Sequence, residues 1–225
     1  MTAVKKIDPG PRTAPPARTT DRIMALLEEH YPQAWCTLDF ANPYQLLVAT
    51  VLSAQCTDER VNLTTPALFK RYPDPASLAG AGIEELEGLV RPTGFFRNKA
   101  KNLKAAAKML VERRQGLVPD KMEELIELPG VARKTANVVL GAAFGIPGVV
   151  VDTHVKRVSA RLGWTVNTNP DKIERDLMAI WPRERWTKLG HQLIAHGRSL
   201  CLARKPRCPS CFLKELCPYP EKEKE

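Results

Sequence analysis

Apolar residues recur at helical spacing along most of the chain, from about residue 21 onward. Asp21 is expected to cap a first helix whose apolar side carries Ile23 and Leu27. Asn42-Pro43 marks the start of a helix that is apolar on nearly all sides, which predicts a central position. The later helices are expected near residues 58–71, 83–90, 98–114, 121–127, 133–144, 153–163, 170–180 and 186–197.

Two stretches fall outside this helical pattern. The run Val149-Val150-Val151 is the only candidate for extended structure, so the sequence predicts an all-α fold. Residues 1–20 contain four prolines and four Lys or Arg against one Asp, with almost no large apolar residues. This composition predicts a disordered basic tail.

The composition predicts a globular protein with a polyanionic partner. The chain has 225 residues, 44% of them hydrophobic, which suffices for a core in one domain or two closely joined ones. No segment has the length of a membrane span or the apolar core of a signal peptide, so we expect an intracellular protein. The net charge of +9 favours nucleic acid but leaves ribosomes and membrane surfaces open. Residues 91–114 hold eight Lys or Arg and one Glu, which indicates a phosphate-binding surface or a solvated helix face.

A tight turn separates two of the expected helices in the stretch LPGVARKTA, residues 128–136. Pro129-Gly130 signals the turn, and the small residues up to Ala132 let backbone amides approach a ligand closely. Amides at a helix start form an anion site, so a DNA phosphate is the natural occupant. The alternative is an ordinary helical hairpin that binds nothing.

Lys134 falls in the first turn of the helix after this hairpin, where exposed N–H groups disfavour a cation. A nucleophilic amine must be neutral, and both the helix dipole and burial favour the neutral form of a lysine. The position therefore suits an amine that attacks carbon. A phosphate contact and a solvated side chain are the alternatives.

The stretch Val151-Asp152-Thr153-His154 supplies a possible partner for this lysine. Asp152 directly follows an apolar run and precedes a helical pattern. A carboxylate there is suited to accept a proton from Lys134 or to stabilise positive charge on a sugar. The simpler interpretation is a helix N-cap, and the two roles are compatible.

Four of the six cysteines lie close together near the end of the chain, with the spacing C-x6-C-x2-C-x5-C. Six cysteines in an intracellular protein favour metal ligation or buried thiols over disulfides. Four thiolates suit either structural zinc or an iron–sulfur cluster, and the spacing alone does not choose between them. Basic residues between the first two cysteines predict that the loop contacts phosphates. The cysteines are Cys201, Cys208, Cys211 and Cys217, and the basic residues are Arg204, Lys205 and Arg207.

Taken together, the stretch Leu52-Ser53-Ala54-Gln55, the hairpin with Lys134, the VDTH stretch and the cysteine spacing resemble the endonuclease III family of DNA glycosylases. The resemblance covers residues 21–220. It implies a helix-hairpin-helix glycosylase fold with two helical lobes, a damage pocket between them and a [4Fe-4S] cluster held by the four cysteines. Residues 36–147 would form the helical barrel lobe with the hairpin, and residues 21–35 with 148–225 the cluster lobe.

The resemblance also implies roles for individual residues. Lys134 becomes the Schiff-base nucleophile and Asp152 the catalytic carboxylate, while Gln55 and Phe95 fill the gap left by an extruded nucleotide. The family often has leucine in place of Phe95 and usually a second glycine in place of Ala132. The residues expected to contact DNA are Gln55, Phe95, Gly130, Val131, Ala132, Arg133, His154, Arg204, Lys205 and Arg207.

The activity implied by the resemblance is base excision at oxidised pyrimidines in double-stranded DNA, followed by β-elimination at the abasic site. A monofunctional adenine or mismatch glycosylase is one alternative, which Lys134 disfavours. A non-catalytic helix-hairpin-helix DNA-binding protein with structural zinc is the other. We further expect a monomer without membrane contacts, which is cytoplasmic and nucleoid-associated if the source is prokaryotic.

Overall fold

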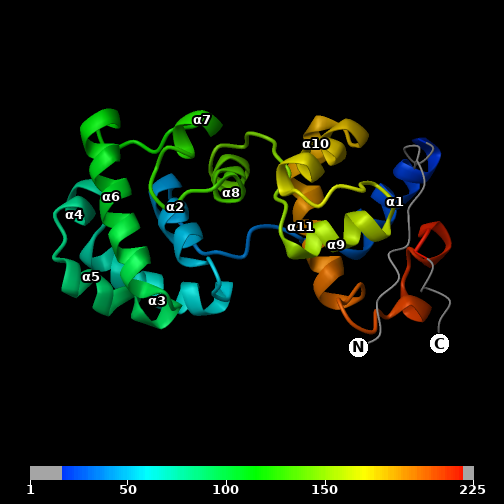
Figure 1. Ribbon diagram of the computed structural model, residues 1–225, viewed down its shortest axis with the longest axis horizontal. Helices are drawn as coiled ribbons and strands as arrows, with labels where there is room; N and C mark the ends of the chain where they lie inside the picture. Colours follow the sequence, from blue (N-terminus) through cyan, green and yellow to red (C-terminus); the bar gives the residue numbers. More distant parts are fainter. Residues whose placement is uncertain (1–16, 220–225) are drawn as a thin grey trace, which may run out of the picture. The chain divides into compact units, whose positions relative to one another are not determined.

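The computed structural model describes residues 17–219 and divides the chain into two compact units. The central unit is Cys36–Gly148, and the terminal unit combines the chain up to Trp35 with the chain from Val149 onward. The regular elements within residues 17–219 are all α-helices or short 3-10 helices, which confirms the expected all-α fold (Figure 1). No helix in this range is long and apolar enough to cross a membrane.

The central unit is built around one apolar helix. Its helices are α2 (Pro43–Leu52), α3 (Asp58–Arg71), α4 (Pro75–Ala79), α5 (Ile83–Val90), α6 (Phe96–Arg114), α7 (Met122–Leu125) and α8 (Arg133–Ala143). Asn42 caps α2 by accepting a hydrogen bond from Gln45 N at 2.9 Å, and Pro43 takes the first helical position. Most residues of α2 are buried, and the helix contacts α3, α6 and α8. Its predicted central position is therefore confirmed.

The helical pattern did not predict α4, which has only five residues. Its start is fixed by a reciprocal cap in which Ser77 N donates to Asp74 Oδ1 at 2.8 Å and Asp74 N donates to Ser77 Oγ at 3.3 Å. Pro75 occupies the first helical position. A helix this short completes little more than one turn, so it leaves no recurring apolar spacing to detect.

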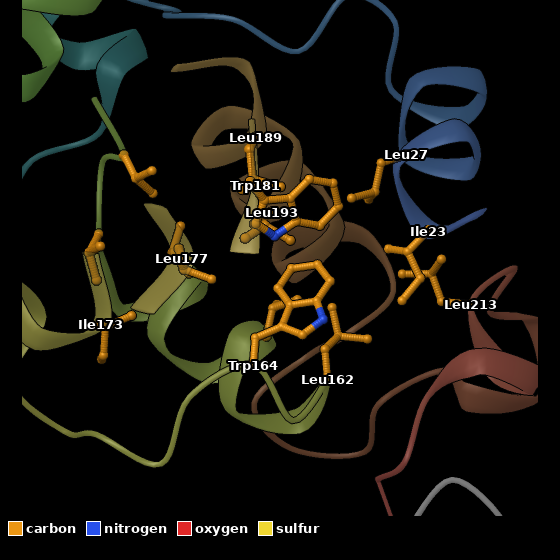
Figure 2. Packing of buried hydrophobic residues seen from close by; sticks show 14 residues of the cluster. Ile23, Leu27, Leu162, Trp164, Ile173, Leu177, Trp181, Leu189, Leu193 and Leu213 are labelled. Atoms are coloured by element: carbon orange, nitrogen blue, oxygen red, sulfur yellow. The ribbon is translucent and has the colours of Figure 1, made fainter. Parts of the chain in front are cut away.

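The terminal unit has its own apolar core, part of which is shown in Figure 2. Its helices are α1 (Ala17–His30), α9 (Thr153–Arg161), α10 (Pro170–Ile180) and α11 (Trp186–Ser199). Ile23 of α1 is buried in this core, and Trp164 and Trp181 meet edge to face with 5.0 Å between ring centroids. Leu213 from the cysteine-rich segment belongs to the same cluster. The first helix and the segment near the chain's end therefore share one core.

The start of α1 corrects two expectations from the sequence. The helix begins at Ala17, so Asp21 lies inside it, and residues 17–20 of the predicted tail are helical. The physical reason is burial, since Thr20 is buried on the same face as Ile23 and Leu27. Residues 1–16 of that tail lie outside the described residues. The run at 149–151 is buried but forms no strand in the described structure.

Polar contacts also hold α1 in the terminal unit. Glu28 accepts hydrogen bonds from Arg185 Nη2 at 2.7 Å and Gln192 Nε2 at 3.0 Å, and it also pairs with Lys188. The hydrogen bond from Lys188 is the largest cause that lowers the pKa of Glu28 from 4.5 to about 2. The resulting stabilisation is present above pH 4.5 and is lost as the pH falls through about 2. Because the carboxylate is 39% exposed, solvent screening limits the gain to about 1 kcal/mol.

Candidate functional site

The central unit contains a helical hairpin formed by α7, a turn and α8. In the turn, Leu128 N donates to Leu125 O at 3.1 Å, and Val131 N donates to Leu128 O at 3.0 Å. Gly130 has φ +83°, a left-handed conformation that strains residues with a side chain. A Cβ atom at Gly130 would also lie 3.0 Å from Asn102 Cβ on α6. Gly130 is therefore the residue of this turn with a left-handed backbone, and the turn predicted at Pro129-Gly130 is confirmed.

Ala132 is the N-cap residue of α8, with φ −92° and ψ 168°. Because its backbone is extended, Ala132 precedes the helix and does not open it. The helix has no side-chain cap, whereas Asn42, Thr57 and Asp152 cap α2, α3 and α9 through side chains. The first amides of a helix have no partner within the helix. The start of α8 therefore offers N–H groups suited to an anion.

Lys134 is the second residue of α8, as the hairpin pattern predicted. Its side chain is exposed. Burial was one of two features expected to suit a reactive amine, and this exposure corrects that expectation. The other feature, a position in the first turn of a helix, is present. The exposed position also leaves Lys134 accessible to a large substrate.

Replacing Gly130 by alanine should destabilise the central unit. The left-handed φ and the close approach of Asn102 together are expected to cost about 1 to 3 kcal/mol. Ala132→Gly in the same turn is the matched control, because the better N-cap preference of glycine offsets its greater unfolded-state entropy to within about 0.5 kcal/mol. Denaturant melts of both variants measure the difference. Equal stabilities would contradict the assigned roles of these two positions.

Gln55 and Phe95 lie in two connections of the central unit. Gln55 follows the end of α2 with φ +54°, and Phe95 precedes α6 with φ +47°. Both side chains are exposed, and the Phe95 side chain is 63% exposed although it is large and apolar. A left-handed conformation is unfavourable for residues of these types. No local sequence pattern predicted this shared backbone conformation.

The basic segment 91–114 is not a uniform charged surface. Lys99 is buried, and its Nζ donates to Leu52 O at 2.8 Å and Thr93 O at 2.7 Å. Lys104 Nζ donates to Ala81 O at 2.6 Å. These two amines are therefore engaged with the protein's own carbonyl groups, and Lys99 is a structural feature that the sequence pattern did not predict.

In the terminal unit, Asp152 is the N-cap residue of α9. Its Oδ1 accepts hydrogen bonds from His154 N and Val155 N, each at 2.8 Å. The side chain is partly exposed. The N-cap interpretation is confirmed, and both backbone bonds use the same carboxylate oxygen.

His154 is linked to the cysteine-rich segment through Arg157. Arg157 Nη2 lies 3.1 Å from His154 Nδ1 and donates to Gly197 O at 2.8 Å, while its Nε donates to Cys201 O at 3.0 Å. Because arginine only donates, His154 Nδ1 accepts in this contact and its proton lies on Nε2. Arg157 therefore connects the start of α9 to the first cysteine of the loop. Sequence patterns did not reveal this residue.

Four cysteines line a single pocket in the terminal unit, together with residues such as Arg161 and His196. The pKa of Cys211 is raised to about 11, mainly by burial and to a smaller extent by charge on the other three cysteines. Arg161 Nη1 donates to Cys201 Sγ at 3.3 Å. The cysteines that share this pocket are Cys201, Cys208, Cys211 and Cys217.

The basic residues of the cysteine loop lie on the protein surface. Arg204, Lys205 and Arg207 are all exposed. Lys205 has φ +50°, and Arg207 N donates to Leu200 O at 2.9 Å, which closes the loop on the end of α11. The loop therefore presents three cations to solvent beside the cysteine pocket.

Residues 48–183, which contain both the hairpin and Asp152, match the family described as HhH-GPD superfamily base excision DNA repair protein. Endonuclease III of Synechocystis sp. is 59% identical to the chain over 197 residues, which cover 87% of this chain and 90% of the relative. The chain belongs to the endonuclease III family within this superfamily.

Two solved structures are similar to the whole described fold. One is a non-covalent endonuclease III–DNA complex, with a TM-score of 0.86 and 43% identity over 91% of this chain and 96% of that chain. The other is a trapped endonuclease III–DNA covalent intermediate, an estranged-adenine complex. Its TM-score is also 0.86 and its identity 43%, over 91% of this chain and 97% of that chain. A covalent enzyme–DNA intermediate has therefore been trapped in a protein that is similar to this chain in fold.

Proposed function

We propose that this chain is a bifunctional base-excision enzyme, a DNA glycosylase and abasic-site lyase that acts as a monomer on oxidised pyrimidines in double-stranded DNA. The observation that carries the proposal is an exposed lysine, Lys134, at the second position of an uncapped helix in the hairpin. A similar protein forms a trapped covalent intermediate with DNA. A lysine amine is the group expected to form such an adduct with a sugar carbon.

In the proposed reaction, the damaged nucleotide is flipped out of the duplex and Lys134 Nζ attacks its C1′ atom. The bond from C1′ to the base breaks, and the base leaves with the electron pair and takes up a proton. Opening of the sugar ring gives an imine between Nζ and C1′. The imine acidifies the C2′ protons, so loss of one of them breaks the C3′–O bond and cuts the strand on the 3′ side.

Asp152 is proposed to act on protons and charge during these steps. Its Oδ1 is held by two backbone amides, which fix the carboxylate at the start of α9. The carboxylate accepts a proton from the attacking amine, or stabilises positive charge as it develops on the sugar. Its cap bonds and its chemistry are compatible, because a carboxylate has several lone pairs.

The DNA contacts are proposed to combine backbone, apolar and ionic groups. The hairpin from Gly130 to Arg133 contacts a phosphate through backbone amides other than that of Val131, which donates to Leu128 O. Gln55 and Phe95 enter the gap left by the flipped nucleotide. We call these two side chains the wedge residues. His154 and the three cations of the cysteine loop contact the sugar–phosphate backbone. Such ionic contacts are independent of sequence and weaken as salt rises.

We also propose that the four cysteines of the terminal unit hold a [4Fe-4S] cluster. The residues fit this group because four thiols line one pocket, and thiolates are the ligands that would hold an iron–sulfur cluster. The guanidinium of Arg161 donates a hydrogen bond to Cys201 Sγ and would stabilise the negative charge of bound thiolates. The cluster supplies cohesion to the loop that carries Arg204, Lys205 and Arg207, and the repair reaction needs no electron from it.

Protein purified anaerobically with iron available should be yellow-brown and contain about four iron atoms per chain. Cys208→Ala should lose both colour and iron. Cys36→Ala is the matched control, because Cys36 belongs to the central unit and does not line the cysteine pocket, so this variant should keep both. Visible absorbance and metal analysis are the measurements. Colourless protein that contains zinc would refute the cluster assignment.

A panel of duplexes tests the proposed activity against its alternatives. The panel carries thymine glycol, adenine opposite 8-oxoguanine, a G·T mismatch, or no lesion. The proposal predicts nicking of the thymine glycol duplex and a covalent adduct when borohydride reduces the imine. Base release without nicking or adduct would indicate a monofunctional glycosylase, and binding without either product would indicate a non-catalytic DNA-binding protein.

A further inference from the structure

Lys99 occupies an unusual place for a lysine. Its side chain on α6 is only 5% exposed, and burial lowers its pKa, an effect that the nearby Cys56 partly opposes. Burying an amine is costly unless its N–H groups find acceptors. Here Nζ donates to Leu52 O at 2.8 Å and to Thr93 O at 2.7 Å. The cost of burial is thus offset by two hydrogen bonds to backbone groups.

The two acceptors belong to the segments that carry the wedge residues. Leu52 ends α2, three positions before Gln55, and Thr93 lies two positions before Phe95. Because both carbonyls bond to one nitrogen, the two connections converge on that point. The backbone N–H of Lys99 also donates to Phe95 O at 3.1 Å. Lys99 therefore contacts both wedge connections, one of them twice. We call Nζ and its two carbonyl partners the Lys99 clamp.

The wedge connections need such support because their backbones are strained. Gln55 and Phe95 both have left-handed φ, and each such residue costs about 1 kcal/mol or more. Both side chains are exposed, so burial of their own apolar surface does little to offset this cost. Strained residues of this kind persist only where surrounding structure fixes them. The Lys99 clamp is the polar contact that both connections share.

We propose that Lys99 is a positioning residue that fixes the spacing and presentation of Gln55 and Phe95 for insertion into damaged DNA. The inference rests on the proposed function, because it assumes that these side chains fill the gap in the duplex. Lys99 itself touches no DNA. Its role is to keep the distance between the two wedge connections constant. Both side chains can then enter the same gap without a loss of backbone conformational entropy on binding.

A purely structural role for Lys99 makes a different prediction. An amine that only caps the carboxyl end of α2 would lower the melting temperature when removed, as any lost cap does. It would leave the complex with damaged DNA unchanged once the folded protein is saturated with DNA. A positioning role instead changes the state of the DNA in that saturated complex.

The test uses full-length protein and a duplex with a tetrahydrofuran abasic-site analogue opposite 2-aminopurine, which fluoresces more strongly when it is unstacked. The analogue cannot form an imine, so the signal reports wedge insertion alone. Lys99→Met removes the ammonium group and keeps an apolar stem. Lys104→Met is the matched control, because it removes one cation and one bond to a carbonyl, Ala81 O, from the same helix. Circular dichroism verifies folding at the assay temperature.

Wild-type protein and Lys104→Met should both brighten 2-aminopurine at saturation, whereas Lys99→Met should give less than about half of that increase. The preference of Lys99→Met for the analogue over undamaged duplex should fall about tenfold. Insertion of the wedge residues contributes a few kcal/mol to binding, and this variant should lose part of that contribution. If Lys99→Met does not fold, Lys99→Gln takes its place with the same expected result, since its side chain is too short to reach both carbonyls.

Full brightening by a folded Lys99 variant, with unchanged preference for the analogue, would overturn the positioning role and leave the proposed enzyme activity intact. Absence of brightening by wild-type protein would overturn the wedge assignment itself, and the role of Lys99 with it. The borohydride adduct on thymine glycol DNA distinguishes this case from failure of the glycosylase and lyase activity.

Discussion

Lys134→Ala is expected to abolish both the borohydride-trapped adduct and strand cleavage at an abasic site. The reason is that alanine has no amine to form the imine, and the lyase reaction begins from that imine. DNA affinity should stay within about tenfold, or roughly 1.4 kcal/mol, because one cation among many is lost. Gel assays of adduct and nicked product, with binding measured in parallel, give all three quantities.

Two further variants distinguish the effect of losing the nucleophilic amine from the effect of losing a positive charge. Lys134→Arg keeps the positive charge at the start of α8 but cannot form the imine, so it should lose the adduct as completely as alanine does. Lys121→Ala removes a lysine whose amine pairs with Glu124 before α7, and it should retain the adduct. An adduct from either Lys134 variant would show that another amine is the nucleophile.

Asp152→Asn is expected to keep the fold and DNA binding but to lose about 10² to 10⁴ in the single-turnover rate of base release. An asparagine oxygen can still accept the bonds from His154 N and Val155 N, because asparagine is a good N-cap residue. It cannot accept a proton as a carboxylate does. The rate of base release from thymine glycol DNA is the measurement.

Asp152→Ala provides the comparison that isolates the cap. Alanine removes the carboxylate and both cap bonds, so it should lose the same activity and also about 1 kcal/mol of stability. Asp152→Asn should lose the activity and keep the stability of the wild type. Wild-type rates in Asp152→Asn would reduce Asp152 to a helix cap and remove it from the chemistry.

The fold could be predicted from the sequence wherever the signal was local and repeated. Asn42-Pro43 located the start of α2, and the periodic apolar residues after it predicted a buried central helix. The start of α1 was misplaced because Asp21 resembles an N-cap, while burial of Thr20 in the tertiary structure extends the helix to Ala17. Tertiary packing that no local pattern encodes accounts for this error.

In the candidate site, too, the features set by neighbouring residues could be predicted, whereas those set by tertiary contacts could not. The turn at Pro129-Gly130 placed Lys134 in the first turn of a helix, since turn chemistry and helix starts are read from adjacent residues. The roles of Lys99 and Arg157 were not predicted, because their partners are far away in sequence. Lys99 bonds to the carbonyl of Leu52, 47 positions earlier, and Arg157 to that of Cys201, 44 positions later. A helical pattern registers both residues only as polar.

The central claim, that Lys134 is the nucleophile, is tested most directly by mapping the reduced adduct. Wild-type protein is incubated with abasic-site DNA and borohydride, and the product is digested with trypsin and analysed by mass spectrometry. Trypsin does not cleave after a modified lysine, so we expect the sugar adduct on a peptide that begins at Lys134 and ends at Lys156. An adduct on the N-terminal amine, or on any lysine other than Lys134, would contradict it.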